Sequence, residues 1–460
     1  MIAGRMVCQS ELRTSPTSEV SLDATAGEDP RALLLTRPMS RLQKNAVGLT
    51  VALCALDGFD VLVITFAASV LERQWGIGKA ELGYILSAGL LGMAGGSALI
   101  APLADVLGRR KVVFLSLTLM ILGTFWTALT GGTAPLICSR VLTGVGIGAM
   151  VAVLNPLAAE YANTRYRDFA VSLLNIGYPI GGVTGGFLAA YVLPAFGWRV
   201  LFVFAGFLGI AMLCLVWRWL PEPISYLIAR PGKDSLGRVN DYLNRCGIPA
   251  VSHLPPPPPD AAALPWTRLF RGGMARVTLT IASSYFLYVI TLFYMQSWVP
   301  ALVVASGFTS SQGAMISVCV SFGGIIGGLS LGWATLRFGL KQIVMTALGF
   351  GAALTVLFGL LSPSLMSFAV TAAFAGFFLF GGMIGLYAII ARSFPAHIRA
   401  TGTGLVIGVG RLGALLGPAL AGLLFSTGMV RSLVSMLMAA PALLAMILLS
   451  SSSVRSRATP

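Results

Sequence analysis

Two aspartates inside an apolar segment constrain this chain more than any other feature of the sequence. Asp57 and Asp60 fall within residues 46–69, and a stretch of roughly 20 apolar residues spans about 30 Å of hydrocarbon. An ionisable group at membrane depth is costly, so its presence indicates a functional site. Residues three positions apart share one face of a helix and lie about 6 Å from each other. The pair is therefore predicted to carry protons; alternatively, one aspartate caps or kinks the helix at Gly58 and the other pairs with an arginine.

Apolar stretches of similar length recur along the chain. With 56% hydrophobic and only 10% charged residues, its 460 residues are more apolar than a soluble domain needs. We therefore predict an all-α polytopic membrane protein with twelve transmembrane helices in two pseudo-symmetric six-helix halves. The stretches are residues 46–69, 82–104, 112–130, 135–159, 169–192, 200–220, 277–303, 311–334, 341–361, 366–391, 403–425 and 432–450.

The polar segments divide the chain into regions. Residues 45–220 and 277–451 are the two expected bundles, and residues 221–276, which contain the proline run 255–259, are expected to form a stiff cytoplasmic loop. Residues 1–44 are predicted to be a disordered cytoplasmic tail, and residues 452–460 a short cytoplasmic tail.

Basic residues are shared unevenly between the two sides of the expected bundle. The side that holds both termini and the central loop carries most of the 31 lysines and arginines. Cytoplasmic loops have such an excess, so both termini are predicted to be cytoplasmic in a multi-pass inner-membrane protein. Orientation then explains the net charge of +15, and no nucleic-acid partner is needed.

The two halves also repeat short motifs at nearly the same separation. Residues 101–110 correspond to residues 332–341, and residues 167–170 correspond to residues 399–402. Such duplication is how many secondary transporters are built, with the substrate site at the interface of the halves.

These motifs resemble those of the major facilitator superfamily. The resemblance rests on Asp105-Val-Leu-Gly108-Arg109-Arg110 after the second span, Arg140-Val-Leu-Thr-Gly-Val-Gly-Ile-Gly in the fourth, and Arg399-Ala-Thr-Gly with Gly-Arg411-Leu-Gly in the eleventh. The narrower pattern Asp57-Gly58-Phe59-Asp60 is similar to the aromatic acid:proton symporters of that superfamily.

The resemblance implies uptake of a benzoate-like or hydroxybenzoate-like carboxylate by alternating access, driven by the proton gradient without a cofactor. It also implies that spans one, four, seven and ten line the central cavity. A small organic acid, protons and membrane lipid are the expected partners, and a monomer is expected. Another organic acid such as the diacid muconate, a sugar, and drug/proton antiport remain alternatives.

The distribution of acids places proton coupling in the first half. All 16 aspartates and glutamates occur at or before Asp260, and only Asp57 and Asp60 lie at mid-membrane depth. Counting about 1.5 Å per residue puts Asp60 level with Arg140, so these two side chains are predicted to pair. The alternative for Arg140 is that it extends to the nearby outer interface.

Arg411 has no acidic residue in its own half of the sequence. A substrate carboxylate is a suitable partner, because guanidinium binds it in a bidentate manner; backbone carbonyls or an acid of the first half are the alternative. Aromatic and amide side chains near the expected cavity are candidates to stack on a ring and bind its hydroxyls. The predicted substrate-binding set is Arg140, Arg411, Tyr285, Tyr288, Gln296, Trp298 and Tyr387.

Charged residues at the cytoplasmic ends of the spans are assigned to gating. Asp105 is expected to latch the halves against the helix that begins at Arg399, where the helix N-terminus favours an anion. The predicted gating set is Asp105, Gly108, Arg109, Arg110, Glu160 and Arg399.

Other classes of protein are poorly supported. The six cysteines are scattered without a Cys-x-x-Cys pair, so no metal site is predicted. The sequence contains no nucleophile motif of an enzyme, and the central loop is too short and proline-rich to be the signalling domain of a receptor.

Overall fold

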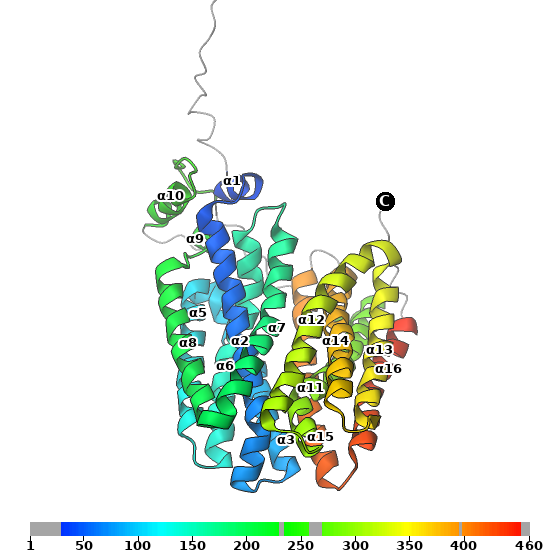
Figure 1. Cartoon of the computed structure of the whole chain (residues 1–460). Coiled ribbons are helices and arrows are strands. Elements are labelled where there is room, and N and C mark those ends of the chain that lie inside the picture. Colours follow the sequence, from blue (N-terminus) through cyan, green and yellow to red (C-terminus); the bar gives the residue numbers. More distant parts are fainter. Residues whose placement is uncertain (1–28, 230–233, 257–268, 395–397, 452–460) are drawn as a thin grey trace, which may run out of the picture.

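The computed structural model describes residues 29–229, 234–256, 269–394 and 398–451, and within them twelve helices are long and apolar enough to cross a membrane. The N-terminal half contains six of these helices and the C-terminal half the other six, as predicted. Figure 1 shows the halves side by side, coloured blue to green and yellow-green to red.

The spanning helices of the N-terminal half agree with the predicted windows, and all except α3 are longer than their window. They are α2 (Arg41–Trp75), α3 (Lys79–Leu99), α5 (Arg109–Leu129), α6 (Thr133–Tyr161), α7 (Arg167–Phe196) and α8 (Trp198–Trp219). The 3₁₀ turn η1 (Ala101–Leu103) and the short helix α4 (Ala104–Leu107) connect α3 to α5.

The C-terminal half repeats this arrangement. Its helices are α11 (Gly273–Ala305), α12 (Ser310–Phe338), α13 (Leu340–Leu360), α14 (Leu365–Ser393), α15 (Arg399–Ser426) and α16 (Arg431–Ser451). The predicted boundary at residue 277 is four residues late, because α11 begins in the polar sequence before the apolar window.

Glycines bring the helices of each half into backbone contact at equivalent places. A Cβ at Gly96 of α3 would overlap the carbonyl of Val145 in α6, and a Cβ at Gly327 of α12 would overlap that of Phe377 in α14. Small residues allow this close approach in membrane helices, where packing rather than hydrophobicity drives association. The matching pairs α3–α6 and α12–α14 support the predicted internal repeat.

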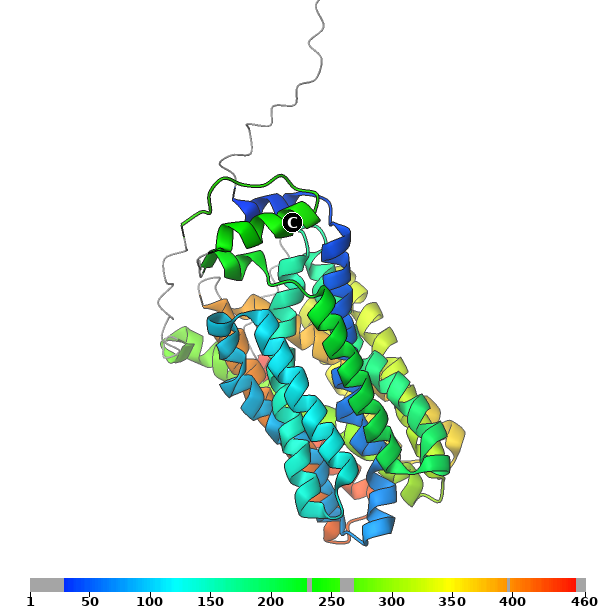
Figure 2. The ribbon, with the colours of Figure 1, turned by 90° about the vertical axis from the view of Figure 1, so that its left-hand side faces the viewer.

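Three short helices form a cap on one end of the N-terminal half. They are α1 (Pro30–Thr36), α9 (Ile224–Ala229) and α10 (Ser235–Arg245), and Figure 2 shows them gathered above that half. We call this end of the bundle the α10 end, and the other the opposite end.

The cap corrects the expectation of a disordered tail over residues 1–44 and an extended loop over residues 221–276. Asp29 caps α1 through the backbone N–H of Arg31, and Ser40 forms a capping box with Gln43 at the start of α2. Helix α10 forms because Val239, Tyr242 and Leu243 share one buried face. Residues 1–28, 257–259 of the proline run and the tail 452–460 lie outside the described residues.

Candidate functional site

A cavity of about 120 Å³ lies between the two halves, and both contribute to its wall. Helix α11 lines it with one face, because Tyr285, Val289, Leu292, Phe293 and Gln296 follow helical spacing. Cys54, Asn175 and Tyr178 face it from α2 and α7, and Tyr387 and Arg411 from α14 and α15. The wall is thus largely apolar, with a few polar groups converging on it.

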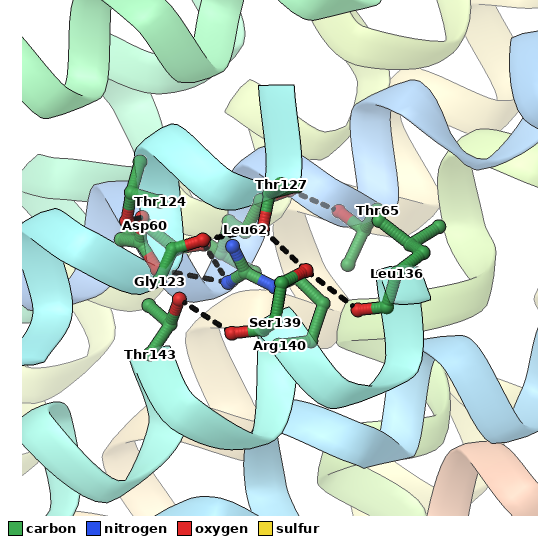
Figure 3. A network of polar contacts seen from close by, with 10 residues as sticks. All are labelled: Asp60, Leu62, Thr65, Gly123, Thr124, Thr127, Leu136, Ser139, Arg140 and Thr143. Carbon is green, nitrogen blue, oxygen red and sulfur yellow. Dashed lines mark hydrogen bonds and ion pairs between the residues drawn. The ribbon is translucent and has the colours of Figure 1, made fainter. Parts of the chain in front are cut away.

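Arg140 and Asp60 form a buried ion pair within the N-terminal half (Figure 3). The Arg140 Nη2 lies 2.8 Å from the Asp60 Oδ2 and also donates to the Asp60 carbonyl at 3.0 Å. The hydroxyl of Thr124 donates to the Asp60 Oδ1 at 2.9 Å. The predicted pairing is confirmed, and the alternative that Arg140 extends to the interface is wrong, because its side chain is 2% exposed.

Hydroxyl groups next to this pair bind α5 to α6, the helix that carries Arg140. Thr127 and Ser139 share a hydrogen bond of 2.9 Å, and Thr143 donates to the Ser139 carbonyl at 3.0 Å (Figure 3). The guanidinium carbon of Arg140 also lies 5.4 Å from the centroid of the Phe202 ring, a favourable cation–π contact. The pair is therefore fixed by packing on several sides.

Asp57 has the opposite environment. Its side chain is fully buried, and neither carboxylate oxygen has a hydrogen-bond partner among the described residues. Asp60 and Arg411 act on it only through longer-range electrostatics. Because a buried charge without hydrogen bonds is costly, this is the environment expected of a group that binds and releases a proton.

Arg411 faces the cavity from the C-terminal half and forms no ion pair with any carboxylate in the described part of the chain. Two hydrogen-bonded pairs share the wall with it. Tyr285 donates to the Tyr387 hydroxyl at 3.1 Å, and the Gln296 amide donates to the Tyr178 hydroxyl at 3.3 Å. Arg411 is thus a partly buried cation open to an anionic ligand.

Three residues of the predicted substrate-binding set do not line this cavity. Tyr288 lies off the cavity face of α11 and its hydroxyl donates to the carbonyl of Leu379. Trp298 anchors α11 to α15 by donating to the Pro418 carbonyl at 3.1 Å. Arg140 is occupied by Asp60. The prediction that these three contact the substrate is therefore not supported, whereas Tyr285, Gln296, Tyr387 and Arg411 do lie on the wall.

Tyr178 and Asn175 are cavity residues that the sequence analysis missed. The expectation was that spans one, four, seven and ten line the cavity, and α7 is span five. The sequence does mark this segment as unusual, because polar Asn175 lies within an apolar span and Pro179 interrupts the same span.

Four of the six predicted gating residues form a cluster at the α10 end, namely Gly108, Arg109, Arg110 and Glu160. Arg109 pairs with Glu160 at 2.5 Å, and the backbone N–H groups of Arg109 and Arg110 donate to the Glu222 Oε1 at 2.7 and 3.3 Å. Glycine at position 108 allows Glu222 to approach these N–H groups. Its φ of 105° is one that other residues rarely adopt, and a Cβ there would lie only 3.0 Å from the Glu222 Oε2. Burial raises the pKa of Glu222.

Asp105 is exposed and makes none of these hydrogen bonds or ion pairs, although its charge acts on Glu160. The side chain of Arg399 lies outside the described residues, so the expected latch between α4 and α15 stays a prediction. Glu222 is a member of this cluster that the sequence analysis missed.

Contacts between the halves lie toward the opposite end. Ser87 of α3 donates to the carbonyl of Leu415 in α15 at 2.9 Å, and Ser311 of α12 to that of Ala190 in α7 at 2.7 Å. Gly83 of α3 packs directly on the Pro418 backbone. The structure therefore has its halves closed together at the opposite end.

No group of three or more His, Cys, Asp or Glu residues in the described ranges is arranged to hold a metal ion.

Known proteins resemble the whole bundle. A sequence profile of the Major Facilitator Superfamily matches residues 49–335 and 281–459. A gallate transporter of Pseudomonas putida is 31% identical over 92% of this chain and 95% of its own. A 4-hydroxybenzoate transporter of Acinetobacter baylyi is 31% identical over 85% of this chain and 86% of its own.

Among solved structures, the similarity to this chain is one of fold, at low sequence identity. The inward open conformation of the xylose transporter XylE from E. coli superposes with a TM-score of 0.69 at 14% identity, covering 89% of this chain and 96% of that one.

Proposed function

This chain belongs to the Major Facilitator Superfamily and is a multi-pass membrane transporter rather than an enzyme, and from that premise we propose that it imports a small aromatic carboxylate together with a proton. We further propose that it resides in the cytoplasmic membrane with both termini and the α10 end inside. The excess of basic residues on that side supports this orientation.

The observation that carries the proposal is Arg411 on the wall of an apolar cavity, without a carboxylate partner among the described residues. A substrate carboxylate supplies that partner in a bidentate contact. The ring of the substrate then lies against Tyr285, Phe293 and Tyr387, whose aromatic faces favour offset or edge contacts. Relatives named as transporters of gallate, 4-hydroxybenzoate and benzoate support the same class of substrate.

Proton coupling is assigned to Asp57. It is the buried carboxylate without a hydrogen-bond partner in the described residues, whereas Asp60 is held by Arg140. An anion that enters a negative-inside cell is opposed by about 2.3 kcal/mol per charge per 100 mV. A proton carried on Asp57 removes that opposition, and the gradient then drives accumulation.

Alternating access is proposed from the closure of the halves. They touch at the opposite end through Ser87 and Ser311, which corresponds to a state closed to the outside. Import requires that these contacts separate and that the α10 end closes in turn, with Arg109 and Glu160 at the moving ends of α5 and α6.

Uptake of labelled acids into cells that express the protein tests the proposal. We expect accumulation of benzoate or a hydroxybenzoate, which a protonophore abolishes because the gradient is its driving force. Muconate and xylose in the same panel distinguish a diacid or sugar carrier. Undiminished accumulation under protonophore would refute proton symport, and uptake of xylose but no aromatic acid would refute the substrate class.

A further inference from the structure

One acceptor atom on the cavity wall lacks a partner. Gln296 is 6% exposed, and its amide nitrogen donates to the Tyr178 hydroxyl at 3.3 Å. The amide oxygen on the same group is buried and accepts no hydrogen bond from any described residue. Buried polar atoms are paired in most proteins, so an unpaired one in a cavity calls for an explanation.

The amide is held in place from the other half of the molecule. Tyr178 belongs to α7 of the N-terminal half and Gln296 to α11 of the C-terminal half. The amide nitrogen is the end turned to Tyr178, which leaves the oxygen as the group offered to a ligand. A hydrogen-bond donor on the ligand satisfies that oxygen, whereas an ether or a bare ring edge does not.

The position of Gln296 relative to Arg411 indicates which part of the ligand it meets. Gly410, next to Arg411, packs against the ring of Tyr285, so Arg411 lies near the level of Tyr285. Gln296 lies three turns further along α11, about 16 Å of helix rise for eleven residues, with apolar Val289, Leu292 and Phe293 between. The side chains of Arg411 and Gln296 both line the cavity between these two levels, so a ligand whose carboxylate lies at Arg411 turns the far edge of its ring toward Gln296.

We propose that Gln296 selects hydroxylated aromatic acids by accepting a hydrogen bond from the ring hydroxyl opposite the carboxylate, and that Tyr178 positions its amide. This inference rests on the proposed function and specifies its substrate class. A site built to bind a hydroxyl discriminates against the analogue that lacks it, because its own polar atom is then left unpaired.

Competition against labelled 4-hydroxybenzoate in cells that express the full chain tests this selection. The competitors are benzoate, the 2-, 3- and 4-hydroxybenzoates, and 4-methoxybenzoate, which accepts but does not donate a hydrogen bond. We expect 4-hydroxybenzoate to compete roughly tenfold better than benzoate or 4-methoxybenzoate, as one hydrogen bond with a buried partner provides. Equal competition by the methoxy compound would overturn the assignment of the oxygen as acceptor.

The variant Gln296→Met keeps the length of the side chain and removes the amide. We expect it to lose roughly tenfold in affinity for 4-hydroxybenzoate and less for benzoate, so that the preference for the hydroxylated acid disappears. Tyr178→Phe should reduce the same preference by a smaller factor. Gln342→Met, at an exposed position of α13, is the matched control and should behave like the parent protein.

The outcomes separate the two proposals. A Gln296→Met protein that still transports benzoate and still prefers the hydroxylated acid overturns the role of Gln296 and leaves the proposed function intact. A parent protein that transports no aromatic acid overturns both. Benzoate transport by the variant also shows that it folds.

Discussion

The two halves of the bundle repeat the same helix packing but contain buried arginines in opposite situations. Arg140 in the N-terminal half is paired with Asp60, and Thr124 supports the carboxylate. Arg411 in the C-terminal half faces the cavity with no carboxylate among the described residues to pair with. A guanidinium whose charge is paired within its own protein has a structural role, whereas one without a counter-charge at a cavity is available to a substrate. The same contrast separates Asp60 from Asp57, one turn apart on α2.

The variant Asp60→Asn should have the largest effect, because it leaves Arg140 buried without a counter-charge. Breaking one partner of a buried pair costs about 3–5 kcal/mol, so we expect a marked fall in melting temperature in detergent together with loss of transport. Glu72→Gln is the control, since its pair with Lys79 is partly exposed and worth less than about 1 kcal/mol. An unchanged melting temperature for Asp60→Asn would remove the distinction between the two carboxylates.

The variant Asp57→Asn should fold normally and lose accumulation alone. The carboxylate makes no hydrogen bond to the described residues, so its removal breaks none, but the proposed proton carrier is gone. In vesicles we expect exchange of labelled for unlabelled substrate to persist while uphill uptake is abolished. If this protein still concentrates substrate, the proton is carried elsewhere.

The variant Arg411→Lys should retain the charge and lose affinity. Lysine cannot present the planar fork that binds both carboxylate oxygens, so we expect the concentration for half-maximal uptake to rise about tenfold. Arg431→Lys is a suitable comparison, because Arg431 caps α13 through the carbonyls of Gly359 and Leu361 far from the cavity. A parent-like affinity for Arg411→Lys would argue against a bidentate clamp.

The variant Thr124→Val should have the smallest effect. It removes one hydrogen bond to Asp60 but leaves the ion pair with Arg140, so we expect a loss of about 1 kcal/mol in stability with transport retained. Thermal unfolding beside uptake measures both. A loss of transport equal to that of Asp60→Asn would mean that Thr124 does more than support the pair.

The sequence predicted the spanning helices and the buried pair well, because both depend on simple geometry. Apolar length sets the spans, and a fixed rise per residue placed Asp60 level with Arg140. The cap was missed because α1 and α10 are short helices stabilised by capping and contact with the bundle, which windows of bilayer length do not detect. Tyr288 and Trp298 were misplaced because depth along α11 is readable from the sequence, whereas the face it turns to the cavity is not.

The contact between the halves at the opposite end is the barrier that the proposed transport cycle has to open. It combines the hydrogen bonds of Ser87 and Ser311, each worth about 1 kcal/mol, with close packing such as that of Gly83 on the Pro418 backbone. Collective domain motions of this kind take place on the microsecond-to-millisecond scale. A bulky side chain at Gly83 would act as a wedge that holds the cavity open to the outside.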